Sequence, residues 1–265
     1  MPSLAKDSGK GSALRPPPVI NSQTNNFLFC SMMQIIPVID LLNGMVVHAK
    51  KGDRNNYQPI QSALCKSSEP IDVVNALLEL YPFERIYIAD LDAITGQSNH
   101  IDNIKYIQAQ HPTLEIWLDA GIRNESNLLL WRDLNLTHVI GSENITSTRD
   151  LSEISECLNR NFILSLDSNQ SGFLGCADLQ TNTDLWPENV ILMSLAQVGA
   201  NQGTNLKLLE KFKHYSKDFN LYAAGGVRNI DDILILKQLG VYGALIASAL
   251  HSRQISADEI ESLNQ

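Results

Sequence analysis

From Gln34 onward, short apolar runs of strand length alternate with segments whose apolar residues recur every three or four positions. The runs are rich in Val, Ile and Leu, which is typical of parallel strands buried on both faces. They predict strands over residues 34–40, 85–91, 114–119, 137–141, 161–167, 189–195, 219–224 and 242–247. Stretches such as 71–81 and 205–215 have the period of amphipathic helices. A further helix should follow Asn229, because Asn229 can cap it and Asp231 and Asp232 would lie in its first turn.

Eight strands that alternate with about eight helices predict an α/β fold, a (β/α)8 TIM barrel. An open, doubly wound sheet is the alternative, because alternation alone does not require closure. A repeat favours closure: the segment 118–142 resembles the segment 223–248, and its Gly121, Arg123 and Asn124 match Gly226, Arg228 and Asn229. The sequence around Asp40, IIPVIDLLNGMVV, likewise resembles FILSLDSNQSGFL around Asp167. Two similar halves predict one barrel built from two half-barrel repeats.

Composition narrows the class of protein. The chain has 265 residues, of which 44% are hydrophobic and 18% charged, and this length suits a single barrel. A net charge of −9 argues against a nucleic-acid partner, and no run approaches the roughly 20 apolar residues that a membrane helix needs. The four cysteines are scattered without paired spacing. We interpret them as reduced thiols of a cytoplasmic protein rather than as metal ligands or disulfides.

Residues 1–32 differ from the rest of the chain. They contain three consecutive prolines and a polar segment, and they have no periodic apolar face. We therefore predict a disordered N-terminal extension at 1–32 and a single barrel at 33–265. The extension could be a targeting peptide, or the true start could lie at Met32 or Met33, just before the first strand. The later start is the interpretation that we favour.

Two aspartates are the first candidates for catalysis. Asp40 ends the first predicted strand and Asp167 ends the fifth, and these strands lie opposite each other in a closed eight-stranded barrel. Catalytic groups of such barrels sit at the carboxyl ends of the strands. Two carboxyls that face one cavity suit a reaction with one proton donor and one proton acceptor. Either Asp could instead only begin a turn. Their equivalent places in the two halves favour the catalytic interpretation.

The glycine turns of the repeat are candidate phosphate sites. Gly121 and the pair Gly225–Gly226 each follow a strand and precede a helix, so backbone N–H groups can approach an anion there. Each turn could combine with the end of the next strand, Gly141–Ser142 or Ala247–Ser248. Ordinary tight turns are the alternative. Arg123 and Arg228 follow the two turns, where either a phosphate contact or a salt bridge to a helix is expected.

Three other groups have competing interpretations. Asp90 and Asp92 could orient a substrate hydroxyl or hold a neighbouring loop, and we favour the loop. The cluster of His48, Lys50, Lys51 and Arg54 could form a lid over a phosphorylated substrate or an ordinary surface loop. His251 is assigned no role.

These motifs together resemble the ProFAR isomerase (HisA) family of histidine biosynthesis and its sister cyclase subunit (HisF). The resemblance runs from about residue 33 to 255 through IIPVIDL, DLDAITG, AGIRN, VIGS, LSLD and AGGVRN, in the order of the family. It implies two phosphate sites and an aldose–ketose (Amadori) isomerisation, with Asp40 as general base and Asp167 as general acid. It implies no metal and no organic cofactor.

Several positions depart from the family pattern. Asp119 and Ala120 stand where the first turn usually has two more glycines, and Ala247–Ser248 replaces a Gly–Arg pair. A carboxylate at position 119 would repel a phosphate. In the changed loop 193–205, Ser194 is the nearest counterpart of a family Thr, and Gly203 is a further candidate for substrate binding. The segments VVHAKKGDRNNYQPI and IASALH look more like a HisA-related subgroup of methanogens and methylotrophs.

Three hypotheses follow from these observations. The first is an isomerase acting on a small phosphorylated ribosyl substrate such as ProFAR. The second is a related lyase, synthase or isomerase in methanopterin-linked one-carbon cofactor metabolism, which the altered first turn favours. The third is a barrel that only binds, against which the intact pair Asp40 and Asp167 argues. No oligomeric state is predicted.

Overall fold

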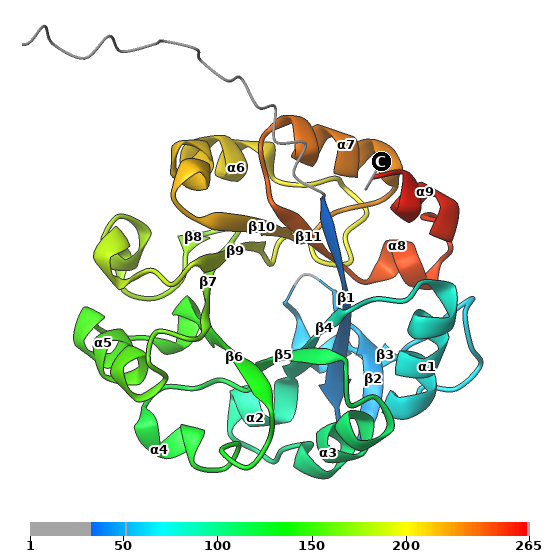
Figure 1. The fold of residues 1–265 in the computed structure, drawn as a ribbon, viewed down its shortest axis with the longest axis horizontal. Coiled ribbons are helices and arrows are strands. Elements are labelled where there is room, and N and C mark those ends of the chain that lie inside the picture. The colour runs from blue at the N-terminus through cyan, green and yellow to red at the C-terminus, as the bar shows by residue number, and fades with distance from the viewer. Residues whose placement is uncertain (1–32, 51, 264–265) are drawn as a thin grey trace, which may run out of the picture. The chain divides into compact units, whose positions relative to one another are not determined.

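The computed structural model describes residues 33–50 and 52–263, and its eight parallel strands close into a barrel (Figure 1). Their order around the barrel is β1 (Gln34–Leu42), β4 (Arg85–Asp90), β5 (Glu115–Asp119), β6 (Leu136–Gly141), β7 (Ile163–Asn169), β9 (Asn189–Ser194), β10 (Asn220–Ala224) and β11 (Gly243–Ile246). Parallel pairing of β11 with β1 completes the ring, with Gln34 opposite Gly243. The (β/α)8 prediction is confirmed, and the open sheet is excluded. The predictions for residues 1–32 lie outside the described residues.

The strands lie where the apolar runs predict them. Each of the eight begins and ends within two residues of its predicted bounds. Both strands that carry the candidate aspartates then turn back into short antiparallel strands, which the sequence pattern did not predict. β2 (Met45–His48) pairs with β1, and β8 (Gly172–Phe173) pairs with β7. The two halves therefore share a local structure beyond the strand itself.

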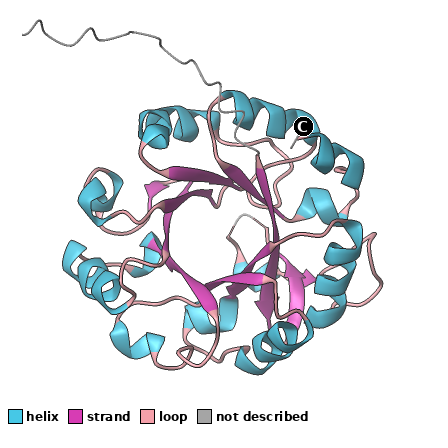
Figure 2. Ribbon diagram, viewed as in Figure 1, coloured by secondary structure: helices cyan, strands magenta, loops and turns pink. Residues whose placement is uncertain are grey.

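Helices surround the ring of strands (Figure 2). They are α1 (Pro70–Leu80), α2 (Leu91–Thr95), α3 (Ile101–Gln110), α4 (Glu125–Leu128), α5 (Thr148–Cys157), α6 (Leu206–Phe212), α7 (Ile230–Gln238), α8 (Ser248–His251) and α9 (Ala257–Ser262). The helices predicted at 71–81 and after Asn229 are confirmed, and the Asn229 side chain accepts a hydrogen bond from the amide of Asp232. The segment predicted at 205–215 is helical, but its second part is the 3-10 helix η5 (Lys213–Lys217).

The expected alternation is incomplete between β8 and β9. Within the described residues, this sector contains only the 3-10 helices η3 (Ala177–Gln180) and η4 (Thr183–Leu185). The sequence there lacks the apolar periodicity of an amphipathic helix. Trp186 covers the barrel instead: it is 1% exposed, and its indole N–H donates to the carbonyl of Leu179 at 2.7 Å. Its ring also packs edge-on against Tyr215 and Phe219.

The inside of the barrel is filled at its amino-terminal end. Trp117 and Tyr222 pack edge-to-face across the interior, with ring centroids 5.0 Å apart. Below them, the Arg85 guanidinium donates to Glu115 at 2.7 Å, and Glu115 also accepts from the indole of Trp117. Gln34 completes this polar layer by accepting from the hydroxyl of Tyr222. The large cavity of the barrel lies at the other end, toward the carboxyl ends of the strands.

Replacing Trp186 tests the packing of the sector between β8 and β9, which contains only 3-10 helices among the described residues. We expect Trp186→Ala to lower the free energy of unfolding by about 3–5 kcal/mol, because it leaves a cavity and an unpaired carbonyl at Leu179. Trp186→Phe should cost less, since it keeps most of the ring contacts. Chemical denaturation of both variants measures the difference. An alanine variant as stable as the wild type would contradict this account.

Candidate active site

The open end of the barrel holds a cavity of about 1020 Å³. Loops after nearly every strand contribute to its wall, which contains four acidic side chains, two tyrosines, two histidines and the second glycine turn. Lining residues that matter below are Asp40, His48, Arg54, Tyr87, Asp119, Glu143, Asp167, Ala224, Gly225, Gly226, Arg228, Ala247, Ser248, Ala249 and His251. This volume suits a small-molecule ligand.

Asp40 reaches this cavity from β1, four strands around the ring from β7. Its backbone lies between Val47 of β2 and Ala89 of β4, so its place is set by sheet register. Burial raises the pKa of Asp40 to about 7; the positive charge of Arg54 partly opposes this shift, and the negative charge of Asp119 adds to it. A carboxyl with such a pKa can exchange a proton near neutral pH.

Asp167 reaches the same cavity from β7 and is only 6% exposed. One carboxyl oxygen accepts from the hydroxyl of Ser165 at 2.6 Å, and the other accepts from the amide of Glu143 at 3.3 Å. Burial raises the pKa of Asp167 to about 7 despite the bond from Ser165, and the charges of Asp119 and Glu143 add to the increase. The fold therefore brings both predicted catalytic residues to one cavity.

Asp119 is a third buried carboxyl, at the end of β5. Its Oδ2 accepts from the hydroxyl of Tyr87 at 3.2 Å, and its Oδ1 accepts from the amide of Gly121 at 3.1 Å. Burial raises its pKa to about 6, although the bond from Gly121 opposes the increase. A Cβ built on Gly141 would lie 3.1 Å from Oδ2 of Asp167 and 3.7 Å from Oδ2 of Asp119. These two oxygens therefore face the same point of the mouth.

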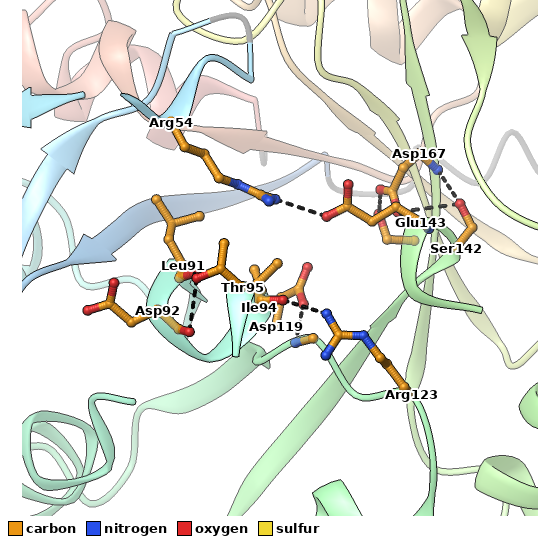
Figure 3. A network of polar contacts seen from close by, with 12 residues as sticks. Arg54, Leu91, Asp92, Ile94, Thr95, Asp119, Arg123, Ser142, Glu143 and Asp167 are labelled. Carbon is orange, nitrogen blue, oxygen red and sulfur yellow. Dashed lines mark hydrogen bonds and ion pairs between the residues drawn. The ribbon is translucent and has the colours of Figure 1, made fainter. Parts of the chain in front are cut away.

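A cation from a loop lies among these carboxyls. Arg54, at the start of the 3-10 helix η1 (Arg54–Asn56), donates to Glu143 at 3.0 Å (Figure 3). Glu143 belongs to η2 (Ser142–Asn144), directly after β6. The two residues lie 89 positions apart in the chain, and sequence reasoning did not pair them. Lys51 of the predicted basic cluster lies outside the described residues.

The first glycine turn has its polar groups occupied. Gly121 has φ of 64°, and an added Cβ would overlap the backbone of Ile94, so glycine is required. Its amide is bound by Asp119. The hydroxyl of Ser142 accepts from the Asp167 amide and donates to the carbonyl of Leu174, both at 2.8 Å. Gly121 does not line the large cavity but a separate one of about 380 Å³.

The second glycine turn opens onto the large cavity. Gly225 and Gly226 line it together with Ala247 and Ser248. The hydroxyl of Ser248 lies 3.2 Å from Nε2 of His48, the last residue of β2. A Cβ on Gly226 would overlap the carbonyl of Gly203, which explains the need for glycine there.

Ser194 and Gly203 lie behind this turn. Ser194 is 3% exposed, and a Cβ on Gly225 would lie 2.5 Å from its carbonyl oxygen. Both residues therefore support the backbone of the Gly225–Gly226 turn from outside the cavity lining.

The two arginines of the repeat make intramolecular contacts. Arg123 donates to the carbonyl of Ile94 at 2.7 Å. Arg228 forms a two-bond ion pair with Asp232 of α7, at 2.9 and 2.8 Å. Of the two roles expected for Arg228, a phosphate contact or a salt bridge to a helix, the structure contains the salt bridge.

Asp90 and Asp92 hold a loop, as the sequence analysis favoured. Asp90 accepts from the backbone and from the ring of His100, and Asp92 accepts from the amide of Asn43 at 2.9 Å. The other ring nitrogen of His100 accepts from the amide of Gly44 at 2.8 Å. This network fixes the turn between β1 and β2, and thereby the strand end that carries Asp40.

His251 lines the cavity, but it is only 4% exposed. Its Nδ1 lies 3.0 Å from the hydroxyl of Ser62, and its Nε2 is buried without a hydrogen-bond partner in the described part of the chain. Burial lowers the pKa of His251 to about 4, and nearby His48 contributes. The ring is therefore neutral near pH 7.

Two features that the described residues lack bear on other classes of protein. No group of three or more His, Cys, Asp or Glu side chains among them could hold a metal ion. None of their helices is long and apolar enough to span a membrane.

The closed ring of strands makes this chain a (β/α)8 barrel protein with carboxyls lining the cavity at its mouth, and comparison with known proteins narrows the class. The family described as "Histidine biosynthesis protein" matches residues 34–256. An uncharacterized protein of Methanocaldococcus jannaschii is 31% identical over 233 residues, which cover 86% of this chain and 97% of that protein.

Two isomerases are also similar. Both are named 1-(5-phosphoribosyl)-5-((5-phosphoribosylamino)methylideneamino) imidazole-4-carboxamide isomerase, the enzyme abbreviated above as ProFAR isomerase. The one from Flavobacterium johnsoniae is 26% identical over 87% of this chain and 98% of its own length. The one from Thermococcus onnurineus is 26% identical over 86% of this chain and 97% of its own length. The chain therefore belongs to the histidine biosynthesis protein family, and the predicted resemblance is confirmed.

The pKa of Asp40 predicts a pH-dependent effect of Asp40→Asn. Because the folded-state pKa of about 7 lies above the ordinary 3.8, ionisation of Asp40 destabilises the fold as the pH rises through this window. Asp40→Asn has no ionisable carboxyl at this position, so it is not destabilised in this way. We expect it to match the wild type near pH 4 and to be more stable above pH 7 by on the order of 2 kcal/mol, a value reduced for contact with the open mouth.

Urea denaturation of both proteins at the two pH values measures this difference. A stability difference that stays constant between them would contradict the raised pKa of Asp40.

Proposed function

We propose that the mouth of the barrel catalyses an aldose–ketose isomerisation of a phosphorylated ribosyl substrate such as ProFAR, with Asp40 as general base and Asp167 as general acid. The observation that carries this proposal is the pair of carboxyls on opposite strands, both lining one cavity and both with pKa values near 7. The relationship of this chain to ProFAR isomerases supports the reaction class.

The charges around each carboxyl support the division of roles. The positive charge of Arg54 favours the ionised form of Asp40, which a base needs. The negative charges of Asp119 and Glu143 favour the protonated form of Asp167, which an acid needs. Both pKa values lie near 7, and Arg54 is the group that favours the ionised form of Asp40 over that of Asp167.

The proposed reaction has two proton transfers. Asp167 gives its proton to the ring oxygen of the ribose, the bond from that oxygen to C1 breaks, and a Schiff base forms with the substituent nitrogen. Asp40 then removes the proton from C2, which leaves an enolamine that tautomerises to the ketose. The atoms balance without a redox partner, and the steps use no cofactor.

Phosphate anchoring would hold the sugar between the two carboxyls. The second glycine turn supports this role, since Gly225, Gly226 and Ser248 all line the cavity. Backbone N–H groups at such a turn can bind an anion, and the Ser248 hydroxyl can add a further hydrogen bond. Ser194 and Gly203 would then support the site by holding the turn in place.

A second substrate is favoured by one specific observation. Asp119 puts a buried carboxyl at the first glycine turn, a place where a two-phosphate substrate would need an anion site. This favours the alternative that the same acid–base chemistry serves a phosphorylated intermediate of one-carbon cofactor metabolism. A barrel that only binds its ligand is less favoured, because burying three carboxyls costs stability without a chemical use.

Turnover of ProFAR tests the first substrate. If ProFAR is the substrate, the purified protein isomerises it, and Asp40→Asn and Asp167→Asn should each lower kcat by about a hundredfold to ten-thousandfold, since each removes one proton transfer. Asp133→Asn is the control, because that side chain is 87% exposed and does not line the cavity.

The result separates the reaction from its substrate. No turnover of ProFAR by the wild type would contradict this substrate. Turnover that survives both Asp variants would contradict the assigned mechanism.

Ser248→Ala tests phosphate anchoring. Loss of one hydrogen bond to a charged group should weaken binding of a sugar phosphate by about tenfold, which corresponds to roughly 1.4 kcal/mol. Isothermal titration of wild type and variant measures the change. An unchanged dissociation constant would remove Ser248 from the site.

A further inference from the structure

The internal repeat makes the two ends of the mouth directly comparable. We call Asp119 and Glu143, which line the cavity, together with Gly121 and Ser142 beside them in the chain, the first end. The repeat matches them with Ala224, Gly226, Ser248 and Ala249, which we call the second end. Asp119 and Ala224 are each the last residue of a barrel strand, β5 or β10. The two ends therefore have matching positions in the fold and differ in their side chains.

The two ends differ in charge. The first end carries two carboxyls that line the cavity, Asp119 and Glu143, whereas the second end carries the methyl groups of Ala224 and Ala249 at the same two places. An anion at the first end would meet like charges in a partly desolvated site, which costs several kcal/mol. At the second end it would meet none of these carboxyls.

The two ends also differ in free donors. At the first end, the amide of Gly121 is bound by Asp119 and the amide of Glu143 by Asp167. A phosphate there would have to displace two carboxyls from the N–H groups that it needs.

The group that occupies the first end is itself a cation. The Arg54 guanidinium reaches across the mouth and donates to Glu143 at 3.0 Å (Figure 3). The positive charge of Arg54 also opposes the increase in the pKa values of Asp40 and Asp119. A side chain of the protein thus already occupies the first end with hydrogen-bond donors and a positive charge.

We propose that the substrate carries a single phosphate, held at the second end, and that the first end binds a hydrogen-bond-donating group, an amine or sugar hydroxyls, through Asp119 and Glu143. This inference rests on the proposed function, because it assumes that the mouth binds a phosphorylated sugar. It makes Asp119 a residue that determines specificity. It also predicts that a substrate with two phosphoribosyl groups, such as ProFAR, is a poor ligand, and it therefore favours the second substrate of the proposed function.

Inorganic phosphate is the probe for this inference. Crystals of the full-length protein and of Asp119→Ala/Glu143→Ala would be soaked in phosphate, and titration calorimetry would count the sites in solution. We expect the wild type to hold one anion, at Gly226 and Ser248. The double variant should gain a second one at Gly121, because it frees that amide and releases Arg54. Affinity at the first end should rise by about tenfold or more.

The reciprocal change provides a matched variant. Ala224→Asp places a carboxyl at the second end, where Asp119 stands in the first, and should abolish the anion at Gly226. Thermal melting checks that each variant is folded. If the double variant does not fold, Asp119→Ala alone, which keeps the Arg54–Glu143 pair, should still show the gain at Gly121.

The outcomes separate this inference from the proposed function. An anion at Gly121 in the wild type, or no gain there in a folded variant, overturns the inference. A wild type without an anion at Gly226 instead contradicts phosphate anchoring in the proposed function, whatever happens at Gly121.

Discussion

Parallel pairing between β1 and β11 is the contact on which the rest of the structure depends. It joins the first strand of the barrel to the last, so the sheet has no free edge between them and the strands must curve around a common interior. Closure then places β1 opposite β7. Asp40 and Asp167, which lie far apart in the chain, face the same cavity for this reason alone. In an open sheet, their carboxyls would lie several strands apart and could not act on one molecule.

Burial of acidic groups dominates the chemistry of the mouth. Asp40, Asp119 and Asp167 all have pKa values raised to between about 6 and 7, and burial is the largest cause for each. The negative charges also raise one another's pKa values, so a proton on one carboxyl lowers the cost of charge on the next. The positive charge of Arg54 offsets part of this repulsion, whereas Glu143 adds to it. The mouth is therefore a coupled set of carboxyls, whose proton distribution depends on the position of Arg54.

Local features of the sequence predicted most of the fold. Apolar runs located all eight strands, and the repeat predicted their closure, because both signals lie within short segments. The absence of an α-helix from the described residues between β8 and β9 was not predicted, since Trp186 covers this sector through contacts with distant aromatic rings. At the site, strand-end aspartates were visible in the pattern. The bonds of Asp119 to Tyr87 and of Arg54 to Glu143 were not, because they join residues 32 and 89 positions apart through side-chain conformations that no periodicity encodes.

The polar layer of Gln34, Arg85 and Glu115 under Trp117 has a consequence for what a ligand meets at the mouth. It fills the barrel at the amino ends of the strands, and the large cavity lies at the opposite rim. Arg54 and Glu143 both line that cavity and form an ion pair there. A ligand that enters the cavity is therefore close to an existing pair, whose strength falls as the salt concentration rises.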